Sequence, residues 1–148
     1  VAATRYPPAG MRGFAGASRA ARFGRVADYH ARAAEELCVL VQVETKRGLE
    51  NLDAIAATEG VDGVFIGPGD LSAALGYLGQ QKHAHVVAVI EDAIRRIRAL
   101  GQAPGILTSD EALGRRYIEA GSLFTAVGVD LSILVRGADA LAAKFSGG

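Results

Sequence analysis

Residues 40–72 read LVQVETKRGLENLDAIAATEGVDGVFIGPGDLS, which predicts a strand, a helix, a second strand and the start of another helix. The first strand is unusual because its polar residues, Gln42 and Glu44, share one face near its carboxyl end, whereas buried parallel strands are normally apolar throughout. The second strand ends in the same way, with Asp70 just beyond it at a helix start. The two carboxylates therefore lie at the carboxyl ends of neighbouring parallel strands, which is where α/β proteins have their active sites.

The rest of the chain continues this alternation. The expected strands cover residues 37–44, 63–66, 103–107 and 123–127, and the expected helices cover 27–36, 46–58, 70–75, 86–100, 110–120 and 131–145. Successive βα units with right-handed crossovers imply a parallel sheet, either doubly wound or part of a (β/α)₈ TIM barrel. No G-x-G-x-x-G turn follows any strand, which weakens the doubly wound option. Four units would be half of a barrel of about 250 residues, with its first and last strands exposed as edges.

Composition bounds the class of protein. The 148 residues contain 16 Lys plus Arg and 16 Asp plus Glu, so no net charge points to nucleic acid or to an anionic membrane. No apolar run reaches the roughly 20 residues of a membrane helix, and nothing resembles a signal peptide. Cys38 is the one cysteine, which suits a reducing cytoplasm, and we expect it to be a buried, inert thiol. The first residue is Val1, and we expect the chain to be a fragment.

Glu44 and Asp70 are oxygen donors suited to a hard divalent cation. Mg²⁺ or Mn²⁺ typically takes one or two carboxylates and leaves its other positions to water or substrate oxygens. Such an ion can polarise a carbonyl and stabilise an enolate. The alternative is that Glu44 forms an ion pair with a nearby lysine or arginine at the rim. Gln42 favours the metal site, because an amide on an interior face needs polar partners that a ligand supplies better than aliphatic side chains.

The turn Gly67-Pro68-Gly69-Asp70 adds an anion-binding element. Glycines let a ligand approach the backbone, and free N–H groups at a helix start attract an anion. A carboxylate can therefore sit on the amides of Gly69 and Asp70 while its neighbouring keto oxygen reaches the metal, which makes a site for an α-keto acid. The alternative is a simple tight turn in which Asp70 caps the helix.

Other polar residues give weaker signals. His83 and His85 lie in a polar loop and lack a third residue at metal-ligand spacing, and no G-x-S-x-G elbow supports nucleophilic hydrolysis. Ser109 and Asp130 are expected to cap their helices. Arg12 follows a Pro-Pro turn, where it either joins surface ion pairs or points at an anionic ligand.

Five motifs make the chain recognisable: RYPPAGMRG, VQVET, GVDGVFIGPGDLS, APGILT and FTAVGVD. In this order and spacing they resemble the HpcH/HpaI aldolase family, and within it the 4-hydroxy-2-oxoheptanedioate aldolase branch. The resemblance covers essentially the whole chain. Family members are (β/α)₈ barrels, so the resemblance implies the C-terminal half of such a barrel, with strands five to eight. Residues 1–148 would be a single partial-barrel domain, in which 1–36 precede four βα units in 37–148.

The resemblance implies a metal-dependent class II pyruvate aldolase. Family members reversibly cleave 4-hydroxy-2-oxo acids to pyruvate and an aldehyde, which is succinate semialdehyde in the heptanedioate branch of aromatic-compound catabolism. Glu44 and Asp70 match the metal ligands, with Mg²⁺, Mn²⁺ or Co²⁺ as the ion, and Leu107 matches a residue near the aldehyde pocket. The implied substrate contacts are Gln42, Gly67, Pro68, Gly69, Asp70 and Leu107. The family more often has alanine where Gly69 stands.

The resemblance also says what this chain lacks. The family's catalytic histidine, its partner aspartate and an arginine lie upstream of the YPP loop, so we expect them before Val1 and expect this chain alone to be weakly active or inactive. Family members form dimers that exchange the last helix, here about residues 131–145, and assemble into hexamers. Two alternatives remain: a non-catalytic half-barrel that works by association, and a citrate-lyase-type CoA-thioester lyase, which the VQVET and GPGDLS motifs fit less well.

Overall fold

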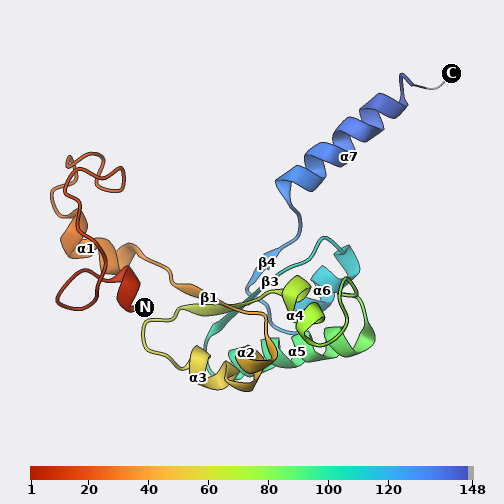
Figure 1. Cartoon of the computed structure of the whole chain (residues 1–148), viewed down its shortest axis with the longest axis horizontal. Helices are drawn as coiled ribbons and strands as arrows, with labels where there is room; N and C mark the ends of the chain where they lie inside the picture. Colours follow the sequence, from red (N-terminus) through yellow and green to blue (C-terminus); the bar gives the residue numbers. More distant parts are fainter. Residues whose placement is uncertain (147–148) are drawn as a thin grey trace.

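The computed structural model of this chain describes residues 1–146, and its centre is a four-stranded parallel sheet (Figure 1). The strands are β1 Leu40–Val43, β2 Gly63–Ile66, β3 Ala103–Leu107 and β4 Phe124–Ala126, and their order in space is β1-β2-β3-β4. Each strand pairs with the next one along the chain. A doubly wound sheet reverses its strand order at a switch point, and this sheet has no such reversal. The predicted α/β class with a parallel sheet is confirmed.

All the helices that follow the first three strands pack on one face of the sheet. The helices are α1 Tyr29–Glu36, α2 Lys46–Glu50, α3 Leu52–Ala56, α4 Pro68–Ala74, α5 Ala84–Ala99, α6 Glu111–Glu119 and α7 Asp130–Ala143, with a 3-10 helix Ala2–Thr4 near the first residue. The core joins α3, α4, α5 and α6 to strand residues of a single parity: Val43, Val64, Ile66 and Ile106. The longest helix, α5, contributes a buried stripe at helical spacing, which includes Val86, Ile90 and Ile97.

The opposite face of the sheet has no covering layer within residues 1–146. Leu40 is 42% exposed and Phe124 is 55% exposed, and the rings of Phe65 and Phe124 lie 5.8 Å apart across this face. Gly105 makes room for this contact, because a Cβ there would lie 2.7 Å from the Phe65 ring. A parallel sheet is normally covered on both faces. We therefore expect this apolar face to pack against further protein, either from the same chain or from another one.

Two segments project away from the sheet at its two ends (Figure 1). Residues 1–36, with α1, form one of them. The other is α7, none of whose residues is buried, and its exposed apolar side chains include Leu131, Ile133, Leu134, Val135 and Leu141. None of the helices in residues 1–146 has the length and apolar character needed to cross a bilayer.

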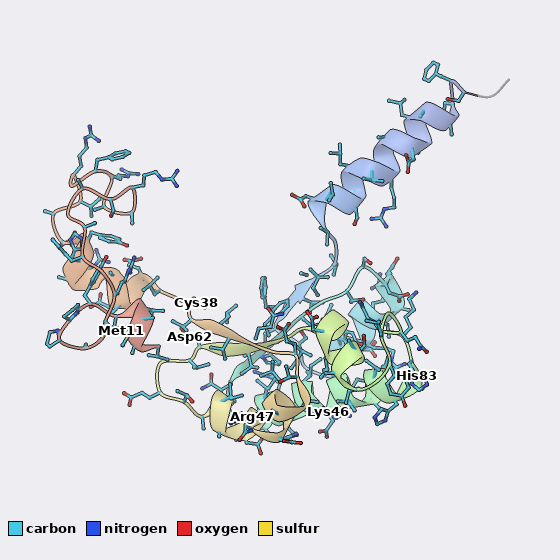
Figure 2. The ribbon with its side chains drawn as sticks, in the orientation of Figure 1. Met11, Cys38, Lys46, Arg47, Asp62 and His83 are labelled. Atoms are coloured by element: carbon cyan, nitrogen blue, oxygen red, sulfur yellow. The ribbon has the colours of Figure 1, made fainter. Side chains whose placement is uncertain are left out.

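The first strand begins three residues later than predicted. Residues 37–39 lie outside the sheet, where the Val39 N–H donates to the Asp62 carboxylate at 2.6 Å. Cys38 is therefore exposed, and the prediction of a buried thiol is wrong (Figure 2). Cys38 belongs to an apolar run that begins before β1, and the hydrophobicity of this run was the only basis for predicting that the thiol is buried.

The predicted helix over residues 46–58 is two short helices that meet at Asn51. The Asn51 side-chain amide donates to the Arg47 carbonyl at 2.7 Å, in competition with the backbone bonds of the helix. Two predicted caps are also wrong. The cap of α6 is Asp110 rather than Ser109, and Asp130 is the first residue of α7 after the cap Val129.

Candidate active site

The carboxyl ends of β1, β2 and β3 bring Glu44, Gly67 and Leu107 into one row. Val43 pairs with Ile66, and Ile66 pairs with Ile106. The next residues in this register are Glu44, Gly67 and Leu107, of which Leu107 is the last residue of β3. The Gly67 N–H donates to the Val43 carbonyl at 3.1 Å, which extends the β1–β2 ladder one residue beyond the strands. By strand alternation the three residues lie on the open face of the sheet, opposite the helical layer.

Gln42 and Glu44 lie against each other over Gly67. The Gln42 side-chain amide donates to Glu44 Oε2 at 2.5 Å. A Cβ on Gly67 would lie 2.5 Å from Glu44 Oε2 and 2.7 Å from Gln42 Nε2, so only glycine leaves room for both side chains. The structure thus brings together three of the residues that the sequence selected.

Asp70 lies in the first turn of α4, three residues after Gly67. Gly67 is the N-cap of α4, Pro68 is its first residue, and the Leu71 N–H donates to the Gly67 carbonyl at 3.0 Å. The N–H groups of Gly69 and Asp70 precede this bond, where a helix offers no backbone acceptor. Because the N-cap is Gly67 and Asp70 is the third residue of α4, the alternative of Asp70 as the helix cap is wrong.

The carboxylates of Glu44 and Asp70 have no cationic partner among residues 1–146. None of the eight ion pairs in this part of the chain includes either residue. The alternative of a rim ion pair for Glu44 is therefore not what the structure shows. No cluster of three or more His, Cys, Asp or Glu side chains forms in the described residues. The donors present fit a hard cation that takes two carboxylates and keeps water or substrate oxygens, as Mg²⁺ does.

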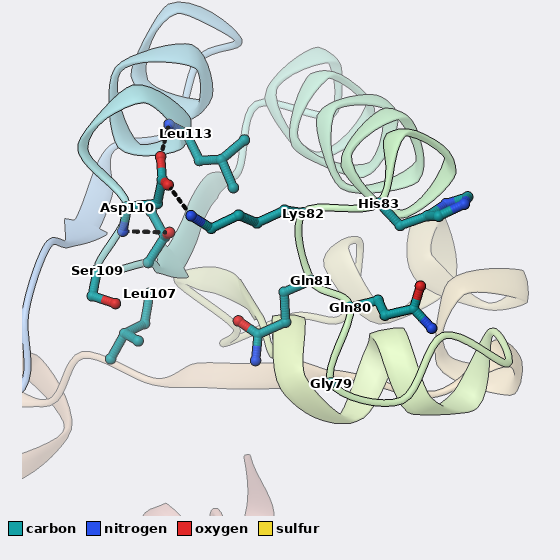
Figure 3. A pocket seen from close by; sticks show the side chains of 10 residues that line it. Gly79, Gln80, Gln81, Lys82, His83, Leu107, Ser109, Asp110 and Leu113 are labelled. Carbon is teal, nitrogen blue, oxygen red and sulfur yellow. Dashed lines mark hydrogen bonds and ion pairs between the residues drawn. The ribbon is translucent and has the colours of Figure 1, made fainter.

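A pocket of about 580 Å³ lies beside this row (Figure 3). Its walls are residues 79–83, which follow α4, and residues 107–110 with Leu113, which join β3 to α6. Leu107 belongs to both the row and the pocket wall. A Cβ on Gly69, the second residue of α4, would lie 3.5 Å from Gln81 Nε2, so the pocket wall also reaches the first turn of α4.

An ion pair joins the two walls of the pocket. Lys82 Nζ lies 2.5 Å from Asp110 Oδ2, and Asp110 Oδ1 accepts from the Leu113 N–H at 2.9 Å (Figure 3). The hydrogen bond from Lys82, followed by that from the Leu113 backbone, lowers the pKa of Asp110 below its ordinary value. Lys82 and Asp110 were not among the site residues predicted from the sequence. The one signal for Asp110 was the helix start after the third strand, where the predicted cap was Ser109.

A family model described as HpcH/HpaI aldolase/citrate lyase matches residues 1–137. The chain belongs to the HpcH/HpaI aldolase/citrate lyase family. The family predicted from the five motifs is confirmed.

Family members with curated names resemble the whole chain. It is 60% identical over 149 aligned residues to a hydroxypyruvate/pyruvate aldolase of Pseudomonas aeruginosa, covering 100% of this chain and 56% of that protein. It is 57% identical over 146 residues to a 4-hydroxy-2-oxo-heptane-1,7-dioate aldolase of Salmonella paratyphi B, covering 98% and 56%. A crystal structure of an HpcH/HpaI aldolase/citrate lyase family protein from Burkholderia cenocepacia J2315 superposes with TM-score 0.88 at 40% identity, covering 97% and 58%. The chain thus spans a little over half the length of these HpcH/HpaI relatives.

In this family member, two other candidates lie outside the row. The Arg12 guanidinium stacks 4.7 Å over the Tyr6 ring and donates to the Tyr29 hydroxyl at 3.3 Å, so an aromatic cluster in residues 1–36 holds it. His83 stacks on Tyr77 with 4.1 Å between ring centroids. Neither arrangement gathers metal ligands within the described residues.

Proposed function

We propose that this chain is the C-terminal half of a metal-dependent class II pyruvate aldolase. The observation that carries the proposal is the Gln42–Glu44 pair, which is held over Gly67 at the carboxyl end of the sheet and has no cationic partner in residues 1–146. Enzymes with (β/α)₈ barrels have their active sites at this edge. The names of the two curated relatives support an aldolase over a citrate-lyase-type enzyme.

The four strands are proposed as strands five to eight of a (β/α)₈ barrel. Three observations support this: consecutive strand order, helices on one face, and large apolar side chains on the other. In a closed barrel the bare face becomes the interior, and β1 and β4 pair with the strands of the other half.

The reaction that this site fits is cleavage of the C3–C4 bond of a 4-hydroxy-2-oxo acid. The 4-hydroxyl loses its proton as C4 becomes the aldehyde carbonyl, and the electron pair of the broken bond passes to C3, which then takes up a proton to give pyruvate. A divalent cation (Mg²⁺, Mn²⁺ or Co²⁺) on Glu44 and Asp70 would polarise the 2-oxo group and so stabilise the enolate that this electron pair creates.

The chain's own residues would bind and orient the 2-oxo acid. Gln42 holds the Glu44 carboxylate by its hydrogen bond, which fixes the orientation of one ligand. The amides of Gly69 and Asp70 would bind the substrate carboxylate at the start of α4, where Pro68 fixes the turn. Gly67, which has no Cβ, leaves the space above its backbone to the side chains of Gln42 and Glu44.

The substrate that we propose is 4-hydroxy-2-oxoheptanedioate or a close analogue, with pyruvate and succinate semialdehyde as products. The groups that move the proton and stabilise the developing charge, a histidine with its aspartate and an arginine, are proposed to lie in the other half of the barrel. We therefore expect the chain alone to turn over slowly, because a missing general base costs about 10²–10⁴ in rate.

The experiment uses a chimera, which we call the completed enzyme. In it the N-terminal part of the Pseudomonas aeruginosa relative, which this chain does not match, precedes Val1. Pyruvate release from 4-hydroxy-2-oxoheptanedioate is measured with Mg²⁺, Mn²⁺ or Co²⁺, beside the unaltered relative and this chain alone. We expect turnover by the completed enzyme and at least about 100-fold less by the chain alone. A folded chimera without aldolase turnover would contradict the proposal.

A further inference from the structure

We infer that Lys82 makes this site prefer aldehydes that end in a carboxylate. The inference rests on the proposed aldolase function and deepens it, because it assigns a residue to the choice of aldehyde. It follows from the position of the pocket, from the charges that line it, and from the hydrogen-bonding capacity that these charged groups have left.

The pocket lies where the far end of a bound substrate would extend. Leu107 is shared by the pocket wall and by the row that contains Glu44 and Gly67. Gln81, the neighbour of Lys82, lies within contact distance of a Cβ built on Gly69. A substrate whose 2-oxo acid group occupies the first turn of α4 therefore has its aldehyde portion directed toward this pocket.

Lys82 and Asp110 are the two side chains with a full charge that line the pocket, and Asp110 already uses both oxygens. Its Oδ1 accepts from the Leu113 N–H and its Oδ2 pairs with Lys82. The third titratable neighbour, His83, is stacked on Tyr77 and accepts from the His85 N–H through Nδ1. No other charged side chain lines the cavity.

The Lys82 ammonium still has donors to offer. A lysine has three N–H donors, and the structure gives Lys82 one partner among residues 1–146, Asp110. The Lys82 side chain is 74% exposed, whereas that of Asp110 is 25% exposed. The ammonium is thus the accessible end of the pair, and Asp110 holds it across the pocket. A carboxylate can join it through a charge-assisted hydrogen bond, which an uncharged aldehyde cannot form.

The test compares two aldehydes of equal carbon number in the completed enzyme. Aldol addition of pyruvate is measured with succinate semialdehyde and with butanal, for Lys82→Gln, Lys82→Arg and the matched control Lys144→Gln, at the exposed end of α7. We expect Lys82→Gln to lower kcat/KM for succinate semialdehyde about 10- to 100-fold, mainly through KM, and to leave butanal unchanged. Lys82→Arg should keep the preference for succinate semialdehyde. Added salt should raise KM for this aldehyde only in the enzymes that have a lysine or arginine at position 82.

An equal loss for both aldehydes, or no loss for either, would overturn the inference, because Lys82 would then only support the loop or do nothing. In those cases the unsubstituted completed enzyme still makes aldol product, so the proposed function stands. Absence of turnover with both aldehydes in the folded, unsubstituted enzyme would contradict the proposed function and with it this inference.

Discussion

Gly67 is the residue on which the geometry of the site depends most. Its backbone continues the β1–β2 ladder, while the side chains of Gln42 and Glu44 occupy the space where a Cβ would be. A side chain at this position would move the candidate metal ligand and the amide that orients it at the same time.

We predict that Gly67→Ala weakens the site far more than Gly69→Ala in the completed enzyme. A Cβ at Gly67 would lie 2.5 Å from Glu44 Oε2, whereas one at Gly69 has its nearest neighbour, Gln81 Nε2, at an ordinary 3.5 Å. Displacement of a reacting geometry by about 1 Å can cost roughly 100-fold in rate. Retro-aldol kinetics and Mn²⁺ affinity measure the difference, and equal behaviour of the two variants would show that the close packing over Gly67 is unimportant.

For single residues, the sequence predicts well on which face of the sheet a side chain lies, but it predicts poorly which residues distant in the chain are in contact. The alternation of side chains was enough to place Gln42 and Glu44 on one face, because that depends only on neighbours in the chain. Their approach to Gly67 depends on the register between two strands, which the local pattern does not contain. The Lys82–Asp110 pair joins residues 28 positions apart and was missed for the same reason.

Among the elements, the two central strands were predicted with the bounds that the structure shows, Gly63–Ile66 and Ala103–Leu107. Each is a short apolar run that ends at a turn, so the pattern itself marks both limits. The first strand and the helix after it were predicted too long, because apolar residues continue beyond the sheet at Cys38 and because the side chain of Asn51 competes with the helix backbone.

The last helix carries a prediction about assembly. In α7, Leu131, Leu134 and Leu141 repeat at spacings of three and seven residues, on one side of a helix, and each is more than half exposed. Burial of a leucine contributes about 1.5–3 kcal/mol. We propose that a second copy of the chain covers this stripe by exchanging α7, within a larger oligomer.

Replacing Leu134 and Leu141 together by glutamate should therefore shift the completed enzyme toward monomers. Sedimentation velocity at one protein concentration compares this variant with Arg136→Ala, a matched change in the same helix away from the stripe. If the double variant sediments like the unsubstituted enzyme, α7 does not hold the subunits together.

At the scale of the whole molecule, the sheet has helices on one face, whereas the other carries the exposed ring of Phe124 beside the partly buried ring of Phe65. The βα order in the sequence predicted a parallel sheet, and the five motifs predicted the family. The order alone did not separate a doubly wound sheet from a barrel, because it does not say on which side each helix packs. The structure adds that α3 to α6 share one core on one face.

The most direct test of the account is a calorimetric titration of the folded completed enzyme with Mn²⁺. We predict one site per chain in the unsubstituted enzyme and in the control Glu50→Gln, an exposed glutamate of α2. Glu44→Gln and Asp70→Asn, which keep size but remove a charged oxygen donor, should each weaken the affinity about tenfold or more. Unchanged Mn²⁺ affinity in both variants would contradict the claim that these two carboxylates hold the catalytic ion.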